Sequence, residues 1–185
     1  KEGLHKRGMK LVLDVVLNHV GPETTLEKTH PDWFHSFGDI TDWKDEQQLR
    51  THDVHGLPDL AQEKEDVAKH LIDQSLEWVR RFDPDGLRID AVRHIDSGFL
   101  SRYTTALKDA VDRPFALIGE VFDGNPETVA RETTATGLTH AFDFPLHFSL
   151  IDGLCRGGDL RKIAVVLTQD RLHPDPDALI TFLDN

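Results

Sequence analysis

The chain has 185 residues and a formal net charge of −12 at pH 7, with 38% hydrophobic and 29% charged residues. These values are ordinary for a soluble globular protein with one sizeable core. The acidic charge without a basic stripe argues against a nucleic-acid partner, and no apolar run is long enough to span a membrane. The single cysteine, Cys155, excludes an internal disulfide and leaves the compartment open.

The N-terminal residues predict the end of a helix followed by a buried strand. Residues 1–10 read as a helix tail that stops near Gly8. Residues 11–17 are nearly all apolar, which is typical of a parallel strand covered on both faces. Asn18 and His19 then fall at the carboxyl edge of that strand, where parallel sheets bind ligands. An ordinary strand-ending turn is the plainer explanation of these two residues taken alone.

Residues 21–62 show no sustained helical or strand period and contain several prolines and an aromatic cluster (Trp33, Phe34, Phe37 and Trp43). Loops of this length inside a compact domain are usually functional lids or small inserted domains. We expect the aromatic residues to give this insertion a small core of its own rather than to stack on a ligand. Asp59, near its end, suits a turn or a cation site.

The rest of the chain alternates helices and strands. The expected helices are 63–81, 97–111 and 125–134, and the expected strands are 86–92, 115–121, 141–144 and 179–183, with a mixed segment to about residue 168. Polar residues gather at the carboxyl ends of the strands, and the catalytic residues of a barrel come from several successive strand ends. The pattern therefore favours a (β/α)₈ barrel over a doubly wound sheet.

The strand at 86–92 carries two charged residues on one face. Arg88 and Asp90 are two positions apart, and Val92 and His94 continue the same alternation. A charged pair on a buried strand is costly unless the charges are paired or used. A structural ion pair is one explanation, and a site is the other. Glu120 ends the next strand about thirty residues later, which is one strand–helix–strand unit.

Asp90 and Glu120 are the candidate catalytic residues that remain after other motifs are excluded. No Gly-rich fingerprint follows a strand, so we expect no organic cofactor, and neither a zinc pattern nor a serine-hydrolase elbow is present. Carboxylates about 5–5.5 Å apart on adjacent strands suit retaining glycoside hydrolysis. Arg88 would favour ionised Asp90 as the nucleophile and leave Glu120 as the acid. A metal-binding pair in a barrel hydrolase and an enolising enzyme stay open.

Four ordered segments resemble the signature regions of the α-amylase family, glycoside hydrolase family 13. They are residues 14–19 (DVVLNH), 86–94 (GLRIDAVRH), 119–122 (GEVF) and 182–185 (FLDN), and residues 57–60 (LPDL) resemble an additional signature. The resemblance implies a partial (β/α)₈ barrel, from about the third strand to the seventh. Residues 1–20 and 63–185 would be barrel parts, residues 21–62 the small inserted domain, and both ends of the catalytic domain would be missing.

The resemblance also implies residue roles, which we carry over by position. Asp90 matches the nucleophile, Glu120 the general acid/base and Arg88 the arginine that supports the nucleophile. His19 matches a substrate-binding histidine. Arg93 and His94 match residues on the leaving-group side, where many members have lysine then histidine.

Calcium is a further expectation from the resemblance. Asn18, Asp59 and the carbonyl of His94 match ligands of a calcium ion that ties the inserted domain to the barrel in many α-amylases. Oxygen ligands from separate segments suit calcium. Ala61, however, stands where the family often has aspartate or asparagine.

The expected activity is retaining hydrolysis of α-glucans such as starch, maltooligosaccharides or cyclodextrins. An α-glucan transglycosylase or isomerase of the same family would use the same carboxylates, a non-catalytic member would only bind a partner, and a metal-dependent barrel hydrolase is a further alternative. The family's last signature continues with histidine and a third catalytic aspartate, whereas this chain ends at Asn185. We therefore expect the 185-residue piece alone to be inactive.

Overall fold

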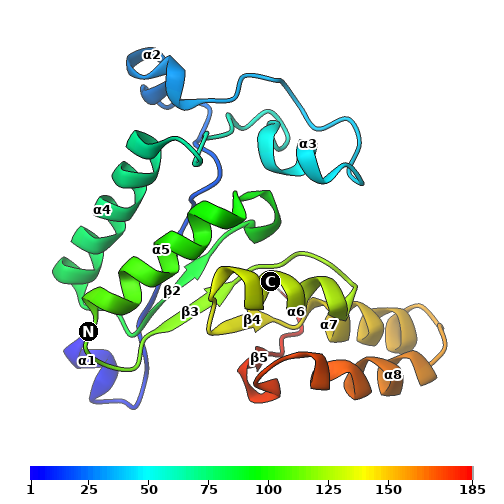
Figure 1. Cartoon of the computed structure of the whole chain (residues 1–185). Coiled ribbons are helices and arrows are strands. Elements are labelled where there is room, and N and C mark those ends of the chain that lie inside the picture. The colour runs from blue at the N-terminus through cyan, green and yellow to red at the C-terminus, as the bar shows by residue number, and fades with distance from the viewer. Residues whose placement is uncertain (185) are drawn as a thin grey trace.

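Five short strands form one parallel sheet in the computed structural model, which describes residues 1–184 (Figure 1). The strands are β1 (Val12–Val15), β2 (Gly86–Ile89), β3 (Ala116–Gly119), β4 (His140–Phe142) and β5 (Leu179–Ile180). Each pairs in parallel with its neighbour in chain order. Sequential parallel pairing with helical crossovers is the topology of a (β/α) barrel. The predicted partial α/β barrel is therefore confirmed.

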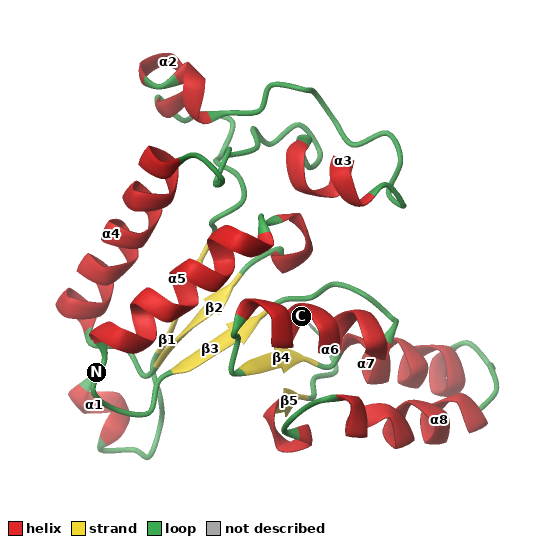
Figure 2. Cartoon of the chain, in the orientation of Figure 1, coloured by secondary structure: helices red, strands yellow, loops and turns green. Residues whose placement is uncertain are grey.

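Helices connect the strands and lie along the sheet (Figure 2). Ahead of β1 is α1 (Glu2–His5), and α4 (Glu65–Phe82), α5 (Ser97–Ala110) and α6 (Pro126–Thr136) precede β2, β3 and β4 in turn. Between β4 and β5 lie α7 (Phe144–Leu150), a π-helical turn (Ile151–Cys155) and α8 (Arg161–Gln169). None of the helices in residues 1–184 is long and apolar enough to cross a membrane.

The two faces of the sheet differ in character. Leu87, Ile89 and Leu117 are fully buried in a core cluster that includes side chains of α4 and α5. The parallel register aligns Asp14 on β1 with Arg88 on β2, and both are less buried than the apolar row. The apolar row anchors the strands to the helices, so the opposite face can carry the charged residues.

Two expectations are wrong, one about the end of β2 and one about the burial of β1. β2 ends at Ile89, Ala91 is left-handed with φ 49°, and Val92–His94 form a 3-10 turn. The alternation predicted through His94 fails because Val92 N–H turns to donate to the Glu120 carbonyl, 3.0 Å away. On β1, Val12 is 39% exposed. This strand is not covered on both faces, because Val12 lies with Asp14 on the face of the sheet that carries the charged residues and is not buried against the helices.

The inserted segment leaves the barrel after β1 and returns through a short antiparallel ladder. Leu60 N–H donates to the Asn18 carbonyl at 2.8 Å, and Val20 N–H donates to the Pro58 carbonyl at 3.2 Å. The segment contains α2 (Leu26–Thr29), a 3-10 turn (Pro31–Trp33) and α3 (Glu46–Thr51). It lies on the side of the sheet to which the strands point (Figure 1).

The insertion does not have the aromatic core of its own that the sequence led us to expect. Trp33 and Phe34 are buried, but they belong to the main core cluster of the barrel. Phe37 is 63% exposed and Trp43 is 48% exposed. The helices of this segment are four and six residues long. They are too short to enclose a core, so the segment packs on the barrel instead.

Candidate active site

Arg88 stands at the centre of a cluster of three carboxylates. Its Nη1 lies 2.6 Å from Asp90 Oδ1 and 2.9 Å from Asp14 Oδ1, and its Nη2 lies 2.9 Å from Glu120 Oε1. Burial alone would lower the pKa of Arg88, but the hydrogen bond to Asp14 and the charges of Glu120 and Asp90 raise it above its ordinary value. One guanidinium therefore holds carboxylates from the ends of three neighbouring strands.

The expectation that Arg88 favours the ionised form of Asp90 and leaves Glu120 as the acid stays a prediction, but Arg88 does not contact Asp90 alone. Arg88 makes an ion pair with each of them, and their side chains are similarly exposed, at 21% and 15%. The sequence reasoning also missed Asp14 as a partner of Arg88. A signal for it was present, because Asp14 is the one charged residue in an otherwise apolar run and lies opposite Arg88 in the parallel register.

The turn after β2 fixes the Glu120 carboxylate from a second side. Ala91 N–H donates to Glu120 Oε2 at 3.2 Å. Ala91 reaches this position with a left-handed backbone, a conformation that costs free energy in a residue other than glycine. Strain of this kind, next to Asp90 and pointing a backbone donor at Glu120, is typical of a functional site.

His19 lies beside Asp90. Burial lowers the pKa of His19, although the charge of Asp90 opposes this shift. Its buried Nδ1 has no hydrogen-bond partner within residues 1–184. A neutral imidazole next to a carboxylate can donate or accept a hydrogen bond with a ligand hydroxyl group.

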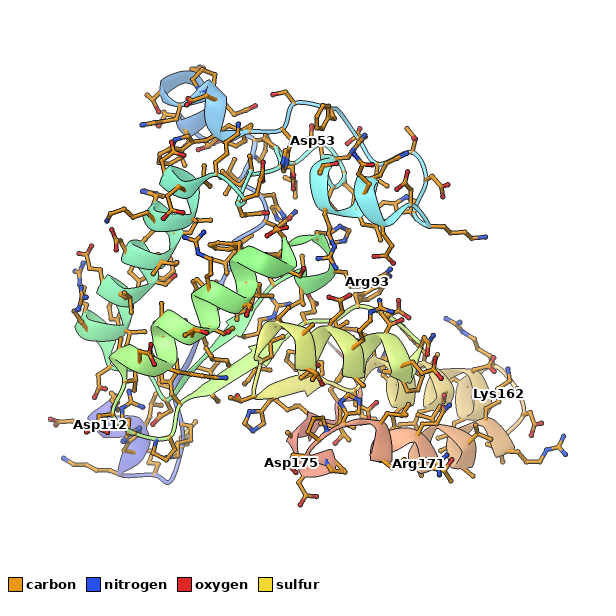
Figure 3. All side chains as sticks on the ribbon, in the orientation of Figure 1. Asp53, Arg93, Asp112, Lys162, Arg171 and Asp175 are labelled. Atoms are coloured by element: carbon orange, nitrogen blue, oxygen red, sulfur yellow. The ribbon has the colours of Figure 1, made fainter. Side chains whose placement is uncertain are left out.

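Arg93 and His94 lie in the turn after β2 and contact the insertion. Arg93 lies between α3 and the segment after β3 (Figure 3), with Nη2 3.3 Å from Glu46 Oε1 and Nη1 2.8 Å from Asp123 Oδ2. His94 Nδ1 lies 2.8 Å from the Leu49 carbonyl, so this nitrogen carries the proton. Burial lowers the pKa of His94, which favours the neutral ring.

A cavity of about 210 Å³ opens beside Glu120. Its lining comprises Trp43, Leu49, Ala91, Arg93, His94, Glu120 and Phe122. Four of these residues were not predicted as site residues, and two of the four, Trp43 and Phe122, are 48% and 62% exposed. Exposed aromatic faces next to charged and hydrogen-bonding groups suit a sugar, which has both apolar and hydroxyl-bearing surfaces.

The surroundings of Asp59 fit the predicted calcium site. Asp59 is fully buried, and its Oδ1 has no hydrogen-bond partner within the described residues. Its Oδ2 lies 2.5 Å from His35 Nδ1. Burial raises the pKa of Asp59 to about 6, and the charge of Asp53 adds to this effect. An unused buried carboxylate oxygen near a second carboxylate fits a bound cation.

Two of the three predicted ligands lie together. Asn18 is fully buried beside Asp59, and the carbonyl of His94 stays a prediction as the third ligand. Within residues 1–184, no three His, Cys, Asp or Glu side chains form a metal-binding group. The donors present are oxygens from an amide and carboxylates, which is the set that calcium prefers.

A parallel α/β barrel with two carboxylates at the ends of adjacent strands is the architecture of a barrel catalytic domain. The profile described as "Alpha amylase, catalytic domain" matches residues 1–170. The chain therefore belongs to the α-amylase family, as its signature segments predict.

Relatives of known identity cover nearly the whole chain. The "Beta/alpha-amylase" of Paenibacillus polymyxa is 31% identical over 98% of this chain and 15% of its own length. The "Cyclomaltodextrin glucanotransferase" of Klebsiella oxytoca is 27% identical over 96% of this chain and 32% of its own. The solved structure of the α-amylase from Geobacillus thermoleovorans, complexed with acarbose, matches with a TM-score of 0.91. It is 37% identical over 98% of this chain and 41% of its own. The chain thus spans less than half of these proteins.

Proposed function

We propose that the protein containing this chain is a retaining glycosidase of α-glucans, with Asp90 as nucleophile and Glu120 as general acid/base. The observation that carries this proposal is the single guanidinium of Arg88, whose two terminal nitrogens contact Asp90 and Glu120 from adjacent strands. Two carboxylates that share one guanidinium lie near each other, and the retaining mechanism requires two neighbouring carboxylates with no water molecule between the nucleophile and the sugar. The family and its named relatives support the substrate class.

The reaction runs in two steps. Glu120 gives its proton to the glycosidic oxygen while Asp90 attacks the anomeric carbon, so the carbon–oxygen bond breaks and a glycosyl ester forms on Asp90. Glu120 then removes a proton from water, which attacks the same carbon and releases Asp90. Before the first step, Glu120 must exchange its ion pair with Arg88 for a proton. Asp14 and Asp90 keep the guanidinium in place when this happens.

His19, Arg93 and His94 are proposed to bind the sugar. His19 lies on the Asp90 side and Arg93 and His94 on the Glu120 side. Their hydrogen-bonding nitrogens would orient the two sugars that flank the cleaved bond.

We also propose that residues 1–185 are inactive by themselves. Asp14 is 62% exposed on the charged face of the sheet, and Val12 and Val16 are exposed beside it. An active site open to water on this side would lose the electrostatic preorganisation that catalysis requires.

The proposal is tested by assaying the full-length protein on soluble starch, maltoheptaose and cyclodextrins. We expect glucose-releasing or maltooligosaccharide-releasing turnover, and NMR should show that the first product has the α-anomeric configuration. A β-anomeric first product would contradict the double displacement. The isolated 185-residue chain, assayed in parallel, should release nothing.

Sugar transfer is the second candidate. Trp43 and Phe122 present exposed aromatic rings on the cavity beside Glu120, and such rings can hold a second sugar where water would otherwise attack. Chromatography of the maltoheptaose reaction separates the two activities. Products longer than seven glucose units indicate transfer, and shorter products alone indicate hydrolysis.

We further propose that Asn18 and Asp59 take part in a structural calcium site. Asp59 Oδ1 is buried without a partner, and the charge of Asp53 acts on the same carboxylate. A cation there would neutralise the buried charge and link the end of β1 to the returning strand of the insertion. Its role would be to stabilise the fold, and it supplies no step of the reaction.

Calcium is expected to raise the melting temperature of the full-length protein by about 2–4 °C at a hundredfold excess over its Kd. Burial raises the pKa of Asp59 to about 6, and the hydrogen bond that His35 donates to Asp59 raises the pKa of His35. Both groups therefore bind protons more tightly in the folded state. Without calcium, the stability that they contribute is present at pH 4 and is lost as the pH rises through 6 and beyond.

Because calcium competes with these protons, its stabilising effect should grow from pH 5 to pH 8. Scanning calorimetry of the full-length protein with calcium or a chelator measures this difference. Asp59→Asn should abolish it, and Asp73→Asn, at an exposed carboxylate on α4, should preserve it. A calcium effect that is equal at pH 5 and pH 8, or that survives Asp59→Asn, would place the ion elsewhere.

A further inference from the structure

The short helix α3 of the insertion contacts three consecutive residues of the turn after β2. Glu46 makes an ion pair with Arg93, the Leu49 carbonyl accepts a hydrogen bond from His94 Nδ1, and Arg50 Nη1 donates to the Ile95 carbonyl. The first two contacts hold side chains of the cavity beside Glu120, and the third holds the backbone that follows them. One helical turn thus sets the position of this part of the site.

Arg50 is the anchor of this arrangement. Its Nη2 lies 3.2 Å from both carboxylate oxygens of Glu132 on α6, and the Glu132 side chain is only 5% exposed. Glu132 has a second partner, Arg131 at 3.3 Å, but Arg131 is 58% exposed. The Arg50 guanidinium therefore joins three elements: α3, the turn after β2 and α6. A buried carboxylate of this kind depends on its partner for compensation of its charge.

The cavity next to this turn lies on the leaving-group side of the cleaved bond. Glu120 lines it, whereas Asp90 does not. Under the proposed function, Glu120 protonates the leaving oxygen, so the departing sugar must occupy the space that borders Glu120. Arg93 and His94 project into that space, and their placement depends on α3.

We propose that Arg50 is a positioning residue for the leaving-group side of the site, acting on Arg93 and His94 through α3 and Ile95. This inference rests on the proposed function and adds a residue with no contact to the substrate. The planar fork of arginine is required, because it donates to a carbonyl and to a carboxylate at the same time. A lysine at this position could satisfy one of these acceptors but not both in the same geometry.

The test compares two substrates in the full-length protein. Cleavage of maltoheptaose requires sugar binding on the leaving-group side. A 4-nitrophenyl α-maltotrioside releases 4-nitrophenolate instead of a sugar, so its cleavage depends far less on that side. For Arg50→Lys we expect kcat/KM to fall about 10–100-fold on maltoheptaose. On the aryl substrate it should change by less than about threefold. Arg102→Lys is the matched control, since Arg102 pairs with Glu65 at 2.8 Å on the exposed surface.

A second variant keeps the test valid if Arg50→Lys folds poorly. The double substitution Arg50→Met with Glu132→Leu replaces the buried ion pair by apolar side chains of similar size, an exchange that commonly preserves stability. It also removes the hydrogen bond to the Ile95 carbonyl. It should therefore show the same loss on maltoheptaose alone, with an unchanged melting temperature. An equal loss on both substrates, or no loss on either, would overturn the positioning role.

The ring of His94 gives a readout that does not depend on turnover. In the wild type, nitrogen-15 NMR should show the proton on Nδ1, because Nδ1 faces the Leu49 carbonyl. The Arg50 variants should show a mixture of the two tautomers, whereas Arg102→Lys should not. If the wild type cleaves neither substrate, the proposed function fails and the His94 tautomer alone decides the positioning role. An unchanged tautomer in the variants would then refute it.

Discussion

Asp90→Asn is expected to lower kcat on α-glucans by a factor of about 10⁴ or more. The amide has the same shape as the carboxylate, so the fold should be retained, but it cannot attack the anomeric carbon or carry the glycosyl group. Arg88 would keep its ion pairs with Asp14 and Glu120, so the cluster remains assembled around an inert side chain. Initial rates on maltoheptaose and a melting curve measure the two properties separately.

Asp112→Asn provides the matched control for this variant. Asp112 lies just after the end of α5, far from Arg93 (Figure 3), and its substitution should leave kcat unchanged. The intact fold of Asp90→Asn should be visible as an unchanged melting temperature. Turnover within tenfold of the wild type in Asp90→Asn would remove this residue from the role of nucleophile.

The barrel could be predicted from the sequence because the strands have a recognisable local sequence pattern. The segments around β1, β2 and β3 are apolar runs followed by polar residues, and the spacing between Asp90 and Glu120 is that of one strand–helix–strand unit. Parallel pairing then puts those strand ends at one edge of the sheet, as the register shows. The local pattern thus gave the fold class and the neighbourhood of the two carboxylates.

The partners within the site could not be predicted in the same way. Arg88 is two residues from Asp90 in sequence, so a local interpretation assigns it to that carboxylate alone. Its contact with Glu120 depends on the distance across β2 and β3, and its contact with Asp14 depends on the register with β1. Side-chain reach across strands is a property of the assembled sheet. The sequence therefore indicated which charged residues are present without showing which carboxylates form ion pairs with Arg88.

The insertion was the least predictable part of the chain. Its helix α3 has six residues and follows the N-cap residue Asp45, whose side chain accepts from Gln47 N–H and Gln48 N–H. A helix of this length shows less than two full turns of periodicity, so the capping residue was its only sequence signal. Trp33 and Phe34 were correctly expected to be buried, but they pack on the barrel, because a short irregular segment has no layer of its own to cover them.

Glu120→Gln is expected to lower kcat on maltoheptaose by a factor of about 10²–10⁴, because glutamine cannot protonate the leaving oxygen. The size of the loss should depend on the leaving group. The fluoride of an α-maltosyl fluoride and the dinitrophenolate of a dinitrophenyl glycoside leave without being protonated. Asp90 can therefore still form the glycosyl ester with these substrates. With such substrates, the variant should show a rapid first release of the leaving group, followed by slow turnover, since no base activates water in the second step.

Azide distinguishes the role of Glu120 as general acid in the first step from its role as general base in the second. It needs no base to act as a nucleophile, so it should restore the second step of Glu120→Gln on an activated substrate and yield an α-glycosyl azide. Asp90→Asn forms no intermediate on that residue, so azide should yield no α-glycosyl azide with this variant. Glu120 N–H and C=O bond the ends of β2 and its turn, so these backbone contacts persist in the variant and keep the site assembled. If Glu120→Gln loses the same factor on activated and unactivated substrates, proton transfer is not the role of this residue.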